Sequence, residues 1–453
     1  MKKYFFTSFI STVLITMGFA QAGSIDTTFK VGNGFDHFVN DIAVQNDGKV
    51  VAVGYFDNYN DTAAARIIRL NSDGSRDHSF VIGTGFPEQV SCVKIDGNGK
   101  IYVGGGFYNY NGNAAERIVR INANGSIDQN FNSSSGFNDY VSSIEFDKNN
   151  KILVAGYFSL YGSDSAKYIA LLDENGVRDT SFKTFLNSYA LNAVVLSNNK
   201  IMVLGSFTKV NGKDRKYIAL LNSDGTLDES FDAGNTFSME MKQCIEVNGK
   251  YLVGGYYGNY ALLNADGSVN NTFVKPNGAN NVLINTIVQQ PNSKILLGGS
   301  FMPLGSSSSS NFIRIESSGV IDDTLNTGTG FGGEVKKIAT LGDTLIYVAG
   351  GMTSYNGKNI KRLLRISAKT INGVGILENE HSIISVYPNP INNFVYLNTK
   401  QANKILVLDV NGKEVLSFNN PSSPIDLSSL NQGVYFLQVF NNEEIKTATL
   451  IKN

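Results

Sequence analysis

Short apolar segments alternate with polar turns along most of the chain, and this pattern repeats about every fifty residues. A Gly-x-aromatic triplet marks the same point in each unit. The triplets are Gly54–Phe56, Gly105–Phe107, Gly156–Phe158, Gly205–Phe207, Gly255–Tyr257, Gly299–Phe301 and, in degraded form, Gly350–Met352. A period of this length is typical of solenoids and propellers.

The first unit shows which elements the pattern predicts. Val39–Val44 forms one apolar strand, Val50–Val53 a second and Ile67–Leu70 a third. An Asp-Gly turn joins the first two strands, a polar loop joins the second to the third, and another Asp-Gly turn follows the third. A short segment ending in Asp77-x-x-Phe80 closes the unit. Three strands and a short fourth predict one antiparallel sheet, which must stack on its copies to bury both faces.

The Asp-x-x-Phe segment predicts how the repeats close. It follows the first six units, in full or weakened form, and is missing after the seventh. A spare copy, 25–29, precedes the first unit. We therefore predict an all-β chain with a seven-bladed β-propeller over residues 23–370, in which the N-terminal strand completes the last blade. An open solenoid is the alternative.

The two ends of the chain differ from the repeats. Lys2 and Lys3 precede a short apolar core that ends in Ala20-Gln21-Ala22, so residues 1–22 are predicted to be a signal peptide cleaved between Ala22 and Gly23. The apolar core is shorter than the roughly 20 residues of a membrane span, so no transmembrane span is predicted. Residues 371–381 are predicted to be a linker, and 382–453 a small C-terminal β-sandwich domain.

Both parts of the chain resemble known families. The repeats, with Tyr-Asn-Gly and then Asp-Gly-x-x-Asp-x-x-Phe as in 105–131, resemble the delta-60 repeat family, whose members look like propellers of secreted or surface bacterial proteins. The C-terminal segment resembles the type A sorting domain of the type IX secretion system of Bacteroidota. The matching residues are Tyr387, Pro388, Asn389, Pro390, Asp409, Gly412, Lys413, Gly433, Tyr435, Lys446 and Lys452. This resemblance implies that the type IX secretion machinery delivers the protein to the cell surface or the medium.

Composition narrows the functional classes. The chain has 38 basic and 39 acidic side chains without an extended basic run, so no nucleic-acid partner is predicted. Cys92 and Cys244 lie in apolar strand patterns and are predicted to be buried free thiols. The three histidines lack zinc-binding spacing, and no nucleophile elbow or phosphate loop is present. We predict no catalytic residue, metal ligand or cofactor.

The Asn71-x-Asp73-Gly74 turn leaves calcium open as an alternative. Equivalent turns have Asn or Ser in place of Asp73, the second possible ligand, which favours hairpin turns over a metal site.

Two sets of residues are candidates for ligand binding. Tyrosines that follow the glycine triplets could stack on a sugar or peptide if they are exposed, whereas the alternative is a ring packed on the next blade. Arginines in the third strand of four units would form an arc that binds an anion or a partner, unless each pairs with the closing-segment aspartate. The candidates are Tyr59, Tyr110, Tyr161, Tyr355, Arg69, Arg120, Arg314 and Arg365.

These patterns favour an exported binding or scaffold propeller with an extracellular glycan or protein ligand. A secreted carbohydrate-active enzyme stays open, because its carboxylate pair would converge from distant strands. A structural component of the cell envelope is a third reading. Whether the mature protein is anchored or released is left open.

Overall fold

The structure of the protein is a computed structural model. It describes residues 21–132, 136–369, 386–387, 389–397, 402–410, 412–419, 421, 424–440 and 445–453. Gln21–Lys369 form one compact unit, and the C-terminal strands belong to a second. The predicted linker and residues 1–20 of the predicted signal peptide lie outside the described residues. In the described part, no helix is long and apolar enough to cross a membrane.

Seven antiparallel three-stranded sheets of the same order fill residues 21–369. The first strands are β1 (Val39–Val44), β6 (Val90–Ile95), β11 (Val141–Phe146), β16 (Ala190–Val195), β21 (Met241–Val247), β24 (Leu283–Gln289) and β28 (Val335–Leu341). The second strands are β2 (Val50–Gly54), β7 (Ile101–Gly105), β12 (Ile152–Gly156), β17 (Ile201–Gly205), β22 (Lys250–Gly255), β25 (Ile295–Ser300) and β29 (Leu345–Gly350). The third strands are β5 (Ile67–Leu70), β10 (Ile118–Ile121), β15 (Ile169–Leu172), β20 (Ile218–Leu221), β23 (Tyr260–Leu263), β26 (Phe312–Ile315) and β32 (Leu363–Ser367).

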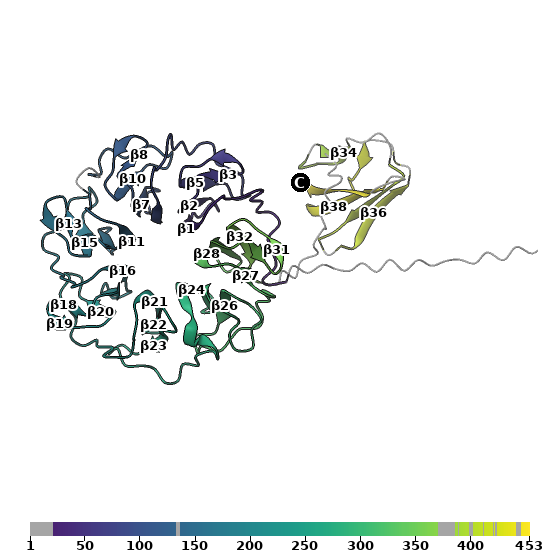
Figure 1. Cartoon of the computed structure of the whole chain (residues 1–453). Helices are drawn as coiled ribbons and strands as arrows, with labels where there is room; N and C mark the ends of the chain where they lie inside the picture. The colour runs from purple at the N-terminus through teal and green to yellow at the C-terminus, as the bar shows by residue number, and fades with distance from the viewer. Residues whose placement is uncertain are drawn as a thin grey trace, which may run out of the picture. The chain divides into compact units, whose positions relative to one another are not determined.

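The sheets are blades arranged in a ring, with their first strands toward the centre (Figure 1). The apolar second strands are almost fully buried, as their continuous hydrophobic runs require. The hydrophobic core lies between neighbouring blades: one cluster joins Tyr347 and Leu363 of the last blade to Val39 and Phe56 of the first. The all-β propeller class is therefore confirmed.

Each first strand contains a β-bulge at the same place. The register shifts between Val39 and Asp41 in β1, and at the equivalent position of every other first strand. A bulge changes the direction in which the next side chains point. This shift decides which residues face the centre of the ring.

The N-terminal segment lies in the last blade. Ile25 forms an antiparallel bridge with Ile366, as Arg76 does with Leu70 in the first blade. The Asp26 N–H donates to the carbonyl of Arg365 at 2.9 Å, and the Gly23 N–H to that of Ser367 at 2.8 Å. Strand β1 also contacts β28, which completes the ring.

Five blades carry a small crossing hairpin on the outer side. The hairpins are β3 (Asn58–Tyr59) with β4 (Thr62–Ala63), β8 (Asn109–Tyr110) with β9 (Asn113–Ala114), β13 (Leu160–Tyr161) with β14 (Asp164–Ser165), β18 (Lys209–Val210) with β19 (Lys213–Asp214), and β30 (Ser354–Tyr355) with β31 (Lys358–Asn359). In the last blade β27 (Phe331–Gly332) pairs with β30. The short 3-10 helix η1 (Ala279–Asn281) lies in the connection that follows the fifth blade.

The second unit is a two-sheet β structure with its own core. One sheet contains β33 (Val386–Tyr387), β34 (Phe394–Leu397) and β37 (Ile425–Asp426). The other contains β35 (Lys404–Leu408), β36 (Glu414–Asn419), β38 (Gly433–Phe440) and β39 (Ile445–Lys452).

Candidate ligand-binding site at the central channel

The tyrosines predicted to face a ligand are buried, so the exposure on which that hypothesis depended is wrong. Tyr59, Tyr110, Tyr161 and Tyr355 expose between 0 and 5% of their surface. The hydroxyl of Tyr59 donates to the carbonyl of Gly74 at 2.6 Å, and that of Tyr110 to the carbonyl of Gly125 at 2.5 Å. Tyr161 repeats this bond to Gly176, and Tyr355 makes it to Gly23. A repeated tyrosine therefore anchors a tight turn in these four blades.

The four arginines do not form an exposed anion-binding arc either, because they are buried and paired within the blades. Their closing-segment partners lie at 2.6–2.8 Å: Asp77 for Arg69, Asp128 for Arg120, Asp322 for Arg314 and Asp26 for Arg365. Each arginine also donates to a backbone carbonyl of the next blade: Ala123, Glu174, Ala368 and Ser72 respectively. They join neighbouring blades.

A repeated lysine explains why the aspartate persists in blades that lack the arginine. Lys151 pairs with Asp179 at 2.6 Å, and Lys200 pairs with Asp228. Lysines at the same position pair with the aspartate in arginine-containing blades too, as Lys49 does with Asp77 at 3.1 Å. Sequence reasoning missed this pair, although the lysine follows the turn before the second strand in each of the first six units.

The Asp-Gly turns have the geometry of hairpin turns. Asp73 Oδ1 accepts the N–H of Ser75 at 2.9 Å, and Gly74 has a φ of +87° that suits glycine. Among the residues that the structure describes, no group of three His, Cys, Asp or Glu side chains is placed to hold a metal ion.

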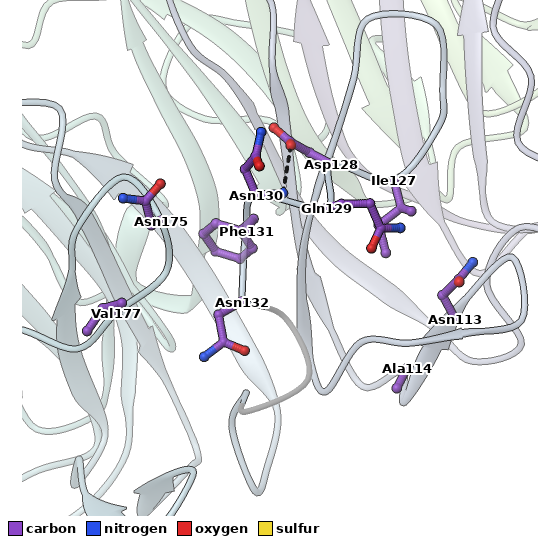
Figure 2. A pocket seen from close by; sticks show the side chains of 10 residues that line it. All are labelled: Asn113, Ala114, Ile127, Asp128, Gln129, Asn130, Phe131, Asn132, Asn175 and Val177. Atoms are coloured by element: carbon purple, nitrogen blue, oxygen red, sulfur yellow. Dashed lines mark hydrogen bonds between the residues drawn. The ribbon is translucent and has the colours of Figure 1, made fainter.

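An outer pocket of about 490 Å³ lies beside the closing segment of the second blade (Figure 2). Two of its lining residues stabilise the fold. Asp128 pairs with Lys100 and Arg120, and Phe131 lies under the guanidinium of Arg120. Since both residues recur in other blades, this pocket carries little evidence for a specific ligand.

A second cavity, of about 530 Å³, occupies the central channel of the propeller. First-strand residues of all seven blades line it, together with three tyrosines that follow second strands. Its polar lining includes Asn40, Ser91, Ser142, Asn192 and Gln243. Several of these side chains also join blades: Asn40 Nδ2 donates to Val90 O at 2.8 Å, and Ser142 Oγ to Ala190 O at 3.0 Å.

We define the mouth of this channel as the end at which two residues of every blade lie next to the β-bulge; of these residues, Tyr55, Tyr140, Tyr157 and Tyr256 line the cavity. One residue directly precedes the β-bulge of the first strand. The other directly follows the second-strand glycine that pairs with the first residue of the bulge. In chain order these pairs are Phe38/Tyr55, Gln89/Gly106, Tyr140/Tyr157, Tyr189/Ser206, Glu240/Tyr256, Leu283/Ser300 and Glu334/Gly351. The neighbouring glycines repeat, whereas these positions vary from aromatic to acidic to small. The repeat is therefore broken at the mouth.

Four mouth residues form what we call the tyrosine cluster: Tyr140, Tyr157, Tyr189 and Tyr256. The rings of Tyr157 and Tyr189 stack at 4.2 Å with an interplanar angle of 20°, and Tyr140 meets Tyr157 edge-on at 5.9 Å. Tyr157 exposes 37% of its surface. Burial of the hydroxyl raises the pKa of Tyr140 to about 12, so this group is neutral at physiological pH. The cluster offers flat, uncharged rings at the channel mouth.

Ion pairs between blades neutralise most charges of the channel. Lys337 of the last blade contacts Asp41 of the first at 2.9 Å, and Lys94 contacts Glu145 at 2.8 Å. Burial opposes the charge on Lys337, yet the Asp41 carboxylate raises the pKa of this lysine above its ordinary value. At the mouth, Lys336 contacts Glu334 at 3.2 Å.

Lys242 differs from these lysines. Its Nζ donates to Asn285 Oδ1 at 2.6 Å, and Asn285 Nδ2 donates to Glu334 Oε1 at 2.7 Å. Burial and the positive charge of Lys336 lower the pKa of Lys242 to about 8. The negative charge of Glu334 opposes this shift only in part. Within the described ranges, Lys242 has no ion-pair partner, in contrast to Lys94, Lys336 and Lys337.

The two cysteines are buried and free, as predicted. Both line the channel cavity, and burial raises the pKa of each thiol above its ordinary value. They are accordingly neutral parts of the channel wall.

Most residues of the predicted sorting signal hold the C-terminal unit together. Asn389 donates to Thr449 O at 2.8 Å and accepts from Ile451 N–H at 2.8 Å. Asp409 accepts the N–H of Lys413 across a turn in which Gly412 has a φ of +79°.

The strands carry the remaining sorting-signal residues. Tyr387 stacks on Tyr396 at 5.7 Å, Gly433 and Tyr435 lie in β38, and Lys446 and buried Lys452 lie in β39. Pro388 lies outside the described residues, and Pro390 follows the cis peptide bond of Asn389.

Comparison with family models agrees with both parts of the fold. Residues 385–453 match the secretion system C-terminal sorting domain. Residues 45–80, 97–131, 148–182, 196–231, 248–273 and 290–325 match a β-propeller domain of unknown function, DUF5122. No curated protein matches the chain.

Two solved structures are similar to the chain at low sequence identity, and the first of them supports the propeller fold. The WD40 β-propeller domain of Doa1 has a TM-score of 0.52 at 16% identity, over 78% of this chain and 97% of that one. PorZ, a surface component of the type IX secretion system of Porphyromonas gingivalis, has a TM-score of 0.46 at 14% identity, over 93% of this chain and 60% of that one.

The sorting domain indicates export to the cell surface or the extracellular space and interaction with the type IX secretion machinery. The chain is therefore a β-propeller protein with six segments that match the DUF5122 model and a C-terminal segment that matches the secretion system sorting domain.

Proposed function

We propose that the exported propeller is a recognition module that binds an extracellular ligand at the tyrosine-lined mouth of its central channel. One observation carries this proposal: the residues at the mouth differ from blade to blade, whereas the buried tyrosines and the Lys–Asp–Arg groups that recur hold the blades together. A repeated fold favours the same residue at equivalent positions, so differences between blades at positions that line a concave cavity favour ligand recognition there.

The chemistry of the mouth suits binding more than hydrolysis. Each acidic side chain at the channel has a partner: Asp41 and Glu145 pair with lysines, Glu334 with Asn285 and Lys336, and Glu240 accepts the hydroxyl of Tyr189 at 2.6 Å. Stacked tyrosines supply contact area at a small entropic cost. This arrangement supports a binding role over the alternative of a carbohydrate-active enzyme.

The test is binding of the purified protein to an array of glycans and extracellular proteins, with and without calcium. We expect one ligand class to bind, and Tyr157→Ala or Tyr256→Ala to weaken that binding about 10-fold or more, as truncation of a buried aromatic anchor does. Tyr108→Ala is the matched control, because Tyr108 is exposed but does not line the cavity.

Melting curves establish that each variant is folded. Ligand binding that survives both channel substitutions, or that Tyr108→Ala weakens equally, would place recognition elsewhere on the molecule.

A further inference from the structure

The channel holds one cation whose counter-charge the described residues do not supply. The amine of Lys242 lies in the wall of the cavity and donates to a neutral amide oxygen of Asn285. Lys336, whose positive charge acts on Lys242, already contacts Glu334. A partly desolvated cation without a carboxylate partner is unfavourable for folding, and a bound anion would remove this cost.

The cavity that Lys242 lines also contains neutral polar side chains, next to paired charged groups and apolar ones. Amide and hydroxyl side chains line the cavity from several blades: Asn40, Ser91, Ser142, Gln243 and Asn285. Such groups donate to and accept from hydroxyls in any orientation. They suit a ligand with several hydroxyl groups.

Aromatic rings complete the site at its open end. Tyr256 lies in the cavity wall with its ring centroid 5.9 Å from the Lys242 amine, and the stacked Tyr157 faces the same cavity. A flat ring presents a face for the C–H side of a sugar. The volume of about 530 Å³ lies within the range of small-ligand sites, which suits a chain end or a short saccharide.

We propose that the channel mouth binds an acidic sugar, and that Lys242 pairs with its carboxylate while the tyrosines contact the ring face. This inference rests on the proposed function and names its ligand class. Lys242 provides the charge selection, the polar lining hydrogen-bonds the hydroxyls, and the tyrosine cluster provides the stacking surface.

Titration calorimetry on the full chain tests this with paired probes that differ only at one carbon: methyl glucuronide against methyl glucoside, and methyl galacturonide against methyl galactoside. We expect an acid of this panel to bind about 10-fold or more tightly than its neutral counterpart. Lys242→Gln should abolish this preference and leave the weaker binding of the neutral sugar. Lys209→Gln is the control, because Lys209 lies on an exposed outer hairpin paired with Asp214.

The pH dependence gives a second measurement. Because Lys242 must be protonated to attract the carboxylate, the preference for the acid should decline as the pH rises above about 8 in the wild type. In Lys242→Gln no such decline should occur.

Three outcomes would overturn the inference. Equal binding of acidic and neutral sugars, unchanged by Lys242→Gln, rejects the carboxylate while leaving a tyrosine-dependent site in place. Binding of an acidic tetrapeptide but of no sugar, lost in Lys242→Gln, rejects the sugar and assigns the site to peptides. No binding of any probe, combined with array hits insensitive to Tyr157→Ala, rejects both the inference and the proposed function.

Discussion

At the scale of single residues, repetition separates structural side chains from candidate functional ones. Tyr157 and Tyr161 lie four positions apart in the same blade, yet Tyr161 is buried under its turn and Tyr157 is exposed at the channel mouth. Tyr55 and Tyr59 show the same contrast in the first blade. In both blades the buried tyrosine supports the fold, and the exposed one at the channel mouth is available for a ligand.

Lys242 gives a prediction about stability. Its pKa is about 8 in the folded chain against an ordinary value of 10.5, so the unfolded chain binds more protons between these values. The cost of the buried charge is fully present below pH 8 and disappears as the pH rises toward 10.5. We expect Lys242→Met to stabilise the protein at pH 7 by about 1–2 kcal/mol.

Urea unfolding of the variant and the wild type at pH 7 and pH 10 measures this difference. The gain should shrink at the higher pH. A variant that is less stable than the wild type at pH 7 would show that the amine contributes to folding through its bond to Asn285.

At the scale of one blade, the Lys–Asp–Arg group joins the second strand, the third strand and the closing segment. Asp322 accepts from both Lys294 at 2.7 Å and Arg314 at 2.6 Å. Burial would raise the pKa of Asp322, but the hydrogen bonds of Lys294 and Thr324 and the charge of Arg314 hold it well below its ordinary value. The Asp322 carboxylate is therefore ionised at neutral and mildly acidic pH.

Two blades provide a matched comparison of this group. Asp322→Asn leaves the buried guanidinium of Arg314 without its carboxylate and should cost about 3–5 kcal/mol of unfolding free energy. Asp179→Asn removes only a pair with the more exposed Lys151 and should cost about 1 kcal/mol or less. Chemical denaturation of both variants checks the order, and equal losses would contradict the role assigned to Arg314.

Acid should destabilise the blades through these aspartates. Hydrogen bonds from Lys151 and Ser181 lower the pKa of Asp179 to about 2, and the pKa of Asp77, Asp128 and Asp322 is lowered too. A lowered pKa gives stability that is present above the ordinary value of 3.8 and is lost as the pH falls through the folded value. Melting temperatures between pH 5 and pH 2 should therefore fall, and less steeply in Asp322→Asn.

At the scale of the whole molecule, closure of the ring depends on contacts between the two ends of the propeller. Arg365 contacts Asp26 at 2.7 Å and the Ser72 carbonyl of the first blade at 2.7 Å, and Lys337 contacts Asp41 across the same junction. These bonds join residues more than 290 positions apart in sequence. Closure removes the exposed sheet edges that an open array would leave.

Asp26→Asn tests this junction. Loss of the carboxylate leaves Arg365 buried and should lower the free energy of unfolding by about 2–4 kcal/mol, with faster proteolysis of residues near the N-terminal segment. Asp164→Asn, in an exposed turn of the third blade, is the control and should change neither. Unchanged proteolysis and stability in Asp26→Asn would show that the apolar contacts of the junction suffice.

The sequence by itself determined the propeller class, the division into a repeat region and a sorting domain, and the buried cysteines. These features are local: each unit restates the same strand lengths, Asp-Gly turns and closing segment within about fifty residues. The sorting domain could also be predicted from the sequence, because its motifs are short and follow one another along the chain.

Only the tertiary structure decided which side chains form the candidate site. Asn40, Tyr157, Lys242 and Lys336 come from four blades and meet only because the ring brings their strands to one channel. The bulge in each first strand sets which residues face the cavity, and strand alternation in the sequence does not reveal it. The sequence therefore predicted ligand binding by the repeated tyrosines and arginines. In the structure these side chains are buried and bonded within the propeller, so they stabilise the fold.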